Sequence, residues 1–162
     1  MARFEDSIEV NVPVRAAYDQ WTQFEEFPQF MSSVERVEQI DDKTLDWAAS
    51  VAGQKKQWRA EITDQTPDRR VAWKSTSGDE NAGAVLFDSL APDRTKVTLM
   101  LDADPKGIVE TIGANIGVLE SQIKKDLERF KEFIESRRTP TGAWRGEIHG
   151  DEVRDGKEVG SR

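Results

Sequence analysis

The residues that most often carry chemistry are scarce in this chain. Its 162 residues include no cysteine and one histidine, His149, which lies in the polar C-terminal segment. This inventory excludes a thiolate metal site, a cysteine nucleophile, a histidine-cluster metal site and a buried histidine base. Asp102 and Asp104 share strand parity, but they precede Pro105 and a long helix, and aspartate near a helix start is favourable without any acid–base role. We therefore assign no catalytic residue, and we expect no metal and no cofactor.

Large apolar side chains gather instead at alternating positions. Trp47, Trp58 and Trp73 share the parity of their apolar neighbours in three strand-like runs, and Phe87 does so in a fourth. Residues 24–31 add three phenylalanines and a methionine. Such rings either fill a core or line an apolar cavity. A strongly curved sheet that is closed by one helix favours the cavity.

The longest element that could position these rings is a helix predicted from Ile108 to Arg138. Its apolar residues recur every three or four positions and form one stripe, whereas the opposite face is charged. The stripe comprises Ile108, Ile112, Ile116, Leu119, Ile123, Leu127, Phe130 and Ile134. A helix of roughly 45 Å must lie across something wide. The strand-like runs upstream predict that this partner is a sheet.

The other elements follow from alternation and turn signals. Residues 4–12 alternate as a half-buried strand, Pro13 begins a short helix that reaches Trp21, and residues 24–31 predict a second short helix. Six strand-like runs follow between Val34 and Ala103 without any strand–helix alternation. We predict an α+β fold in which a seven-stranded, curved, antiparallel sheet wraps around the long C-terminal helix. The two short helices lie between its first and second strands.

Composition limits the partners and the compartment. The net charge of −8 and the pI near 4.8 disfavour nucleic acid and an anionic membrane surface. The chain starts without the pattern of a signal peptide, and no run is long and apolar enough to insert into a membrane. We therefore expect a cytoplasmic protein.

We predict one domain over residues 1–138 and a polar, largely disordered tail over residues 139–162. Trp144 is the exception in this tail. We hypothesise that it folds back onto the domain or mediates a contact with a second copy or another protein. The equal alternative is an incidental residue in a flexible segment.

Several motifs appear in the order found in the START-like helix-grip superfamily, which is also called Bet v 1-like. They are Ile8–Pro13 leading to Trp21, Phe24–Met31, Trp58–Ile62, Val71–Ser75 and Leu127–Lys131. Over residues 3–137 the chain resembles the bacterial polyketide cyclase/dehydrase (SRPBCC) group and is similar to coenzyme Q-binding START proteins. The resemblance implies a helix-grip fold with a cavity between sheet and helix. That superfamily includes lipid carriers, quinone binders and aromatase/cyclases, so the resemblance does not select one activity.

Three functions are therefore open. The leading one is binding, transport or sequestration of a small hydrophobic, aromatic or lipid-like molecule without covalent chemistry. The second is a polyketide aromatase/cyclase or dehydrase, and the third is an accessory interaction protein with a vestigial pocket. The residues expected to contact the ligand are Trp21, Phe27, Phe30, Met31, Trp47, Trp58, Trp73, Ser75, Phe87, Leu99, Ile112, Ile116 and Leu119.

Overall fold

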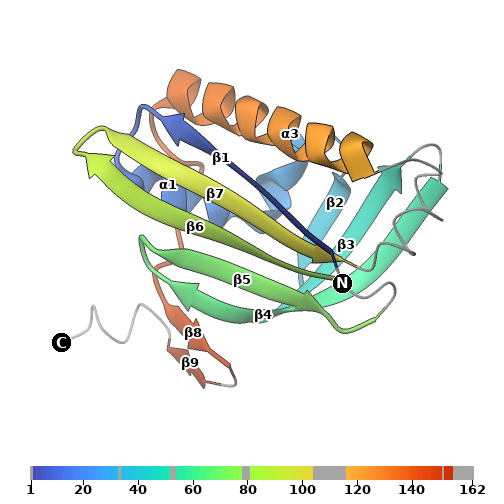
Figure 1. Cartoon of the computed structure of the whole chain (residues 1–162). Helices are drawn as coiled ribbons and strands as arrows, with labels where there is room; N and C mark the ends of the chain where they lie inside the picture. Colours follow the sequence, from blue (N-terminus) through green and yellow to red (C-terminus); the bar gives the residue numbers. More distant parts are fainter. Residues whose placement is uncertain are drawn as a thin grey trace.

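The computed structural model describes residues 2–32, 34–51, 54–77, 81–103, 116–150 and 152–154 (Figure 1). The elements run in the order β1 (Ala2–Val10), α1 (Val14–Trp21), the 3-10 helix η1 (Phe24–Gln29) and β2 (Val34–Gln39). The predicted strands continue with β3 (Thr44–Val51), β4 (Gln54–Thr66), β5 (Arg70–Ser75), β6 (Asn81–Ala91) and β7 (Arg94–Ala103). The described chain ends with α3 (Ile116–Arg137), β8 (Glu147–His149) and β9 (Glu152–Arg154).

The strands form an antiparallel sheet in the order β1-β7-β6-β5-β4-β3-β2. Strands β2 to β7 follow one another as a meander, and β1 pairs with β7 along its whole length, from Ala2 opposite Ala103 to Val10 opposite Thr95. The register shifts in the pairs β2/β3, β4/β5 and β6/β7. Such bulges bend a strand and increase its twist, which helps the sheet to curve. The predicted α+β architecture is confirmed, and β8 and β9 extend the sheet beyond the seven predicted strands.

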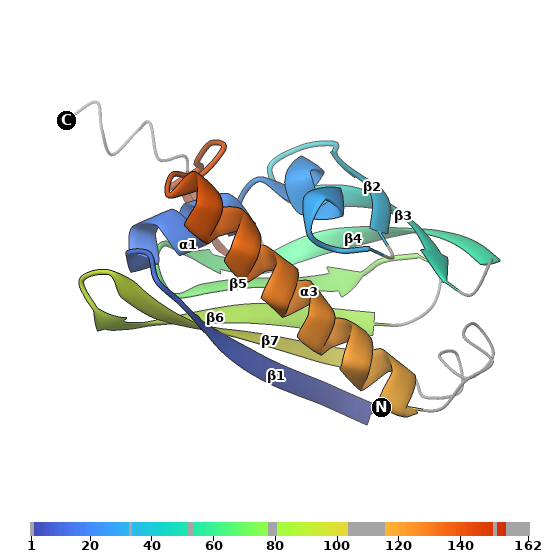
Figure 2. The same ribbon diagram turned by 90° about the horizontal axis from the view of Figure 1, so that it is seen from above.

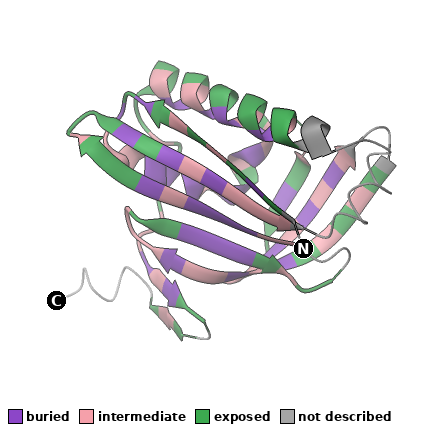
Figure 3. Cartoon of the chain, viewed as in Figure 1, coloured by how far each residue is buried: buried purple, intermediate pink, exposed green. Residues whose placement is uncertain are grey.

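Helix α3 covers the concave face of this sheet. Figure 2 shows it lying diagonally, with its first turn near the start of β1 and its last turn near α1. Ile123, Leu127, Phe130 and Ile134 are buried, which confirms this half of the predicted stripe (Figure 3). The predicted residues 108–115 lie outside the described part of the chain. No helix in the described ranges is long and apolar enough to cross a lipid bilayer.

The two predicted short helices lie between β1 and β2. Pro13 has extended backbone angles and precedes the first turn of α1, which buries Ala17, Tyr18 and Trp21. Pro28 lies inside η1, and the segment is a 3-10 helix that buries Phe24 and Phe27. Together α1 and η1 form a bent wall that closes one end of the concave face.

The segment after α3 differs from the expected disorder wherever the structure describes it. β8 pairs with Asp64 and Gln65 of β4, beyond the point where the pairing of β3 with β4 ends at Glu61. Ile148 of β8 is fully buried, and Trp144 packs against the core. Composition indicated disorder because apolar residues are few here, but these two side chains are placed where the core can bury them. Residues 155–162 lie outside the described residues.

Candidate functional site

A row of inward-facing residues crosses the concave face from β1 to β5. Phe4 of β1 lies opposite Leu101 of β7, Leu101 lies opposite Gly83 of β6, and Gly83 lies opposite Trp73 of β5. Because Gly83 has no side chain, the indole of Trp73 lies over it. A Cβ atom added at Gly83 would be 2.5 Å from Cζ2 of Trp73. The missing side chain therefore fixes the position of the Trp73 ring on the floor of the sheet.

Trp73, at the end of this row, belongs to a stack of three tryptophans from neighbouring strands. Trp47 and Trp58 are directly opposite each other on β3 and β4, and their rings are nearly parallel, 5.7 Å apart between centroids and inclined by 7°. The rings of Trp47 and Trp73 are 6.1 Å apart and inclined by 29°. The indole nitrogens of Trp47 and Trp58 are buried without a hydrogen-bond partner among the described residues. Buried donors are nearly always paired, so both N–H groups could donate to an acceptor, although Trp21 Nε1 in the packed core is unpaired in the same way.

A second aromatic cluster closes the end of the concave face at α1 and η1. The ring of Trp21 lies 5.2 Å from Phe27, 5.3 Å from Phe30 and 5.1 Å from Phe130 of α3. Phe27 also lies 5.7 Å from Trp47 and so joins this cluster to the tryptophan stack. Edge and tilted contacts at these distances are those of a packed core. The interior of this end is therefore filled by packed rings, although an open cleft of about 490 Å³ lies on its outer side beside Gln23, Phe24 and Trp144.

An open cleft of about 470 Å³ lies at the other end of the concave face, between β1 and the start of α3. Phe4 and Ile123 form its apolar base. Its polar edge is formed by Glu5, Asp6, Glu120, Ser121 and Lys124. These residues were not among the sequence-predicted contacts. The signal that could have found them is the parity of Asp6, which places a carboxylate on the inner face of β1 between Phe4 and Ile8.

The predicted contact residues fall into four groups. Trp47, Trp58, Trp73 and Leu99 lie on the inner face of the sheet, as expected, and Trp58 is half-buried. Trp21, Phe27, Phe30, Met31 and Phe87 are buried in the core at the α1–η1 end, where Phe87 meets Tyr18 at 5.4 Å. Ser75 is half-buried and its Oγ accepts a hydrogen bond from the Asn81 backbone N–H. Ile112 and the side chains of Ile116 and Leu119 lie outside the described residues.

Polar contacts tie α3 to the loop after η1. The Gln122 amide donates to Ser32 Oγ at 2.7 Å and to Asp126 Oδ1 at 2.9 Å, and the Ser32 backbone N–H donates to the same carboxylate. Burial raises the pKa of Asp126 above its usual value, although the hydrogen bonds from Gln122 and Ser32 act in the opposite direction. This cluster holds the η1 wall against the helix.

Comparison with known proteins gives a consistent set of relatives. A family model described as "Polyketide cyclase / dehydrase and lipid transport" matches residues 10–135. A protein of Streptomyces lincolnensis, described as an uncharacterized 17.2 kDa protein in the melC2-rnhH intergenic region, is 53% identical over 149 residues. That match covers 91% of this chain and 99% of the relative.

Solved structures share the fold. The Zhui aromatase/cyclase from Streptomyces sp. R1128 superposes with a TM-score of 0.70 at 16% identity, covering 88% of this chain and 98% of that one. A protein from Deinococcus radiodurans gives 0.67 at 28% identity, with coverage of 84% and 99%. A START superfamily protein from Mycobacterium smegmatis gives 0.65 at 15% identity, with coverage of 83% and 95%. The START-like helix-grip fold is thereby confirmed.

Proposed function

Because this chain belongs to the polyketide cyclase/dehydrase and lipid transport family, we propose that it binds a small hydrophobic or aromatic molecule in the cytoplasm, between the concave face of the sheet and the C-terminal helix. The observation that carries the proposal is the stack of Trp47, Trp58 and Trp73 on that face. The cleft between β1 and α3 is the proposed entrance, because Phe4 at its base lies in the same row as Leu101, Gly83 and Trp73 of the stack.

The chemistry of the floor indicates what the molecule is like. Burial of apolar surface supplies about 25 cal/mol per Å², and contact with an aromatic ring adds about 0.5–1.5 kcal/mol per ring pair. The unpaired indole N–H groups of Trp47 and Trp58 favour a molecule that carries a carbonyl or hydroxyl oxygen. A flat ring with one such oxygen satisfies both requirements better than a simple alkyl chain does.

Two measurements test this proposal. Native mass spectrometry of the protein purified from its own host is expected to show a co-purifying apolar molecule. Titration with 1-naphthol, which is a flat ring with one hydroxyl group, is expected to quench tryptophan fluorescence. Trp58→Leu should weaken the affinity for 1-naphthol about tenfold, because it removes one ring contact and one donor.

Ile40→Ala is the matched control, because Ile40 is an exposed apolar residue outside the cleft and the stack. The affinity of Ile40→Ala for 1-naphthol should equal that of the parent protein. A protein that is always empty, together with a Trp58→Leu variant that binds 1-naphthol as tightly as the parent, would contradict the proposal. That result would favour an accessory protein with a vestigial pocket.

A second candidate function is a polyketide aromatase/cyclase or dehydrase. The likeness to the Zhui aromatase/cyclase favours it, and so does the polar edge of the cleft, where Asp6, Glu120 and Lys124 could move protons. Turnover of a poly-β-ketone thioester that is lost in Asp6→Asn would establish this activity. Unchanged 1-naphthol affinity in the same variant would show that the loss is one of chemistry and not of binding.

A further inference from the structure

The segment after α3 is fastened to α1 by a dense set of polar contacts. We call its described residues, 139–150 and 152–154, the strap. Thr141 and Gln20 exchange two hydrogen bonds, from the Thr141 backbone N–H to Gln20 Oε1 and from Gln20 Nε2 to Thr141 Oγ1. The Trp144 backbone N–H donates to Thr22 Oγ1 at 3.1 Å. The family model ends at residue 135, so the strap lies beyond the part of the chain that the family model matches.

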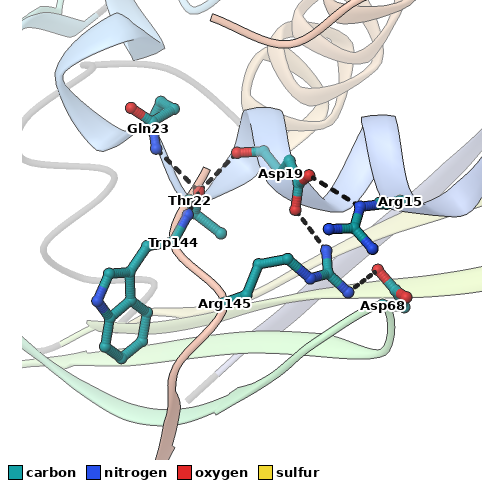
Figure 4. Close-up of polar contacts among 7 residues, drawn as sticks. All are labelled: Arg15, Asp19, Thr22, Gln23, Asp68, Trp144 and Arg145. Carbon is teal, nitrogen blue, oxygen red and sulfur yellow. Dashed lines mark hydrogen bonds and ion pairs between the residues drawn. The ribbon is translucent and has the colours of Figure 1, made fainter. Parts of the chain in front are cut away.

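Arg145 is the centre of this attachment (Figure 4). Its guanidinium lies 2.5 Å from Asp19 Oδ1 on α1 and 2.8 Å from Asp68 Oδ1 in the β4–β5 turn, and it sits over the Tyr18 ring at 5.5 Å. The Asp19 side chain is 7% exposed and that of Arg145 is 24% exposed. Burial raises the pKa of Asp19, and Arg145 opposes this shift by stabilising the charged form. If the strap left, a buried carboxylate would lose its main partner, which is costly.

The strap is fastened a second time at the sheet. β8 pairs with Asp64 and Gln65 of β4, and the Gly150 backbone N–H donates to the Thr63 carbonyl at 2.9 Å. Ile148 is fully buried between these contacts. The strap therefore bridges α1 and β4. Its contacts with α1 can break while β8 stays paired with β4.

The strap-bound part of α1 is the part that supports the aromatic wall. Gln20 and Thr22, which bind the strap, flank Trp21. Trp21 contacts Phe27 and Phe30, and Phe27 contacts Trp47 of the tryptophan stack. A chain of direct contacts thus leads from the strap to the floor of the proposed ligand site.

We propose that the strap is a latch: while Arg145 is held between Asp19 and Asp68, the α1–η1 wall stays closed against the tryptophan stack, and release of the strap lets the wall open and the ligand exchange. The ligand part of this inference rests on the proposed function, whereas the control of wall opening does not. Opening the strap from α1 breaks the Arg145 ion pairs and the hydrogen bonds of Thr141 and Trp144 but leaves β8 paired with β4, so it costs less than unfolding the whole domain.

The test uses the full chain and two matched variants. Arg145→Ala removes the ion pairs to Asp19 and Asp68. Arg154→Ala is the control, because Arg154 lies in the same strap but pairs with exposed Glu152. Hydrogen exchange by mass spectrometry reports opening of α1 and η1 separately from opening of β6 and β7. Stopped-flow release of bound 1-naphthol reports ligand exchange.

Arg145→Ala is expected to speed exchange in the strap, α1 and η1 about tenfold or more, the effect of losing a charge-assisted hydrogen bond. Exchange in β6 and β7 should stay at the parent rate, and 1-naphthol should leave about tenfold faster. Arg154→Ala should change none of these rates. Asp68→Asn, which keeps the shape of the side chain, should give a smaller change in the same direction and serves if Arg145→Ala does not fold.

The outcomes separate the two proposals. If the strap of Arg145→Ala exchanges faster while α1, η1 and 1-naphthol release keep their parent rates, the strap is not a latch. If the strap exchanges no faster than in the parent, Arg145 does not fasten it, and the inference also fails. A uniform rise that includes β6 and β7 would indicate a purely structural role. A parent protein that binds no 1-naphthol would overturn the proposed function, while exchange in α1 and η1 would still decide the latch.

Discussion

Replacing Gly83 with alanine would show whether the tryptophan floor is fixed by the absence of a side chain. The new Cβ would lie 2.5 Å from Cζ2 and 2.6 Å from Cε2 of Trp73, whereas carbon atoms normally meet at about 3.5–4.0 Å. The indole must therefore shift by roughly 1 Å. Trp73 is 5% exposed and stacks on Trp47, so it has little room to move. Overpacking of this kind costs about 1–3 kcal/mol.

Urea denaturation followed by tryptophan fluorescence measures the free energy of unfolding, and near-ultraviolet circular dichroism reports the stacked indoles. Gly83→Ala should lower the stability by about 1–3 kcal/mol and change the dichroism. Ala82→Ser, at the neighbouring position on the opposite face, is the control and should do neither.

A double variant identifies the cause. Trp73→Phe removes the atoms that the new Cβ would meet, so Gly83→Ala combined with Trp73→Phe should be more stable than the sum of the single effects by about 0.5 kcal/mol or more. Additive effects, or a Gly83→Ala variant with parent stability and unchanged dichroism, would refute the reasoning.

Three further predictions concern the strap and α3. Ile148→Ala should lower the free energy of unfolding, measured by urea denaturation, by about 2–5 kcal/mol. Val153→Ala should lower it clearly less, because Val153 is only half-buried. Equal losses would show that β8 is not part of the core. A hydrogen bond to Glu147, aided by the charge of Asp64, raises the pKa of His149 above 6.5. The stabilisation that protonated His149 contributes is therefore complete below pH 6.5 and is lost as the pH rises through the raised value. An NMR titration of His149 should show a lower midpoint in Glu147→Gln than in the parent. Because burial raises the pKa of Asp126 above 3.8, ionisation lowers stability as the pH rises from 3.8 through the folded-state value. Urea denaturation should therefore show Asp126→Asn gaining stability relative to the parent as the pH rises through that value.

The sheet and its helix were predictable because each carries a periodic signal. Trp47, Trp58 and Trp73 share the parity of their apolar neighbours, and parity alone is enough to place them on the inner face. The apolar stripe containing Ile123 and Leu127 likewise identified the helix that covers the sheet.

Other features depend on pairings that no single segment encodes. The place of Gly83 beneath Trp73 depends on the register between β5 and β6, and the cleft depends on how Phe4 meets α3. The strap has strands of three residues each, too short for a period, and it is held by Arg145, whose two partners are far away in the sequence. That Trp47, Trp58, Trp73 and Leu99 touch a ligand stays a prediction.

The pairing of β1 with β7 has a consequence for how the protein is made. Strand β1 is synthesised first, yet Ala2 needs Ala103 and Val10 needs Thr95 as partners. The hairpins from β2 to β7 can form one after another as they leave the ribosome, whereas the first strand must wait until the last of them has appeared. Until it inserts, β7 presents an unpaired edge that could recruit another nascent chain. We therefore expect the docking of the N-terminal strand to limit the folding rate and to be the step at which chaperones protect this protein.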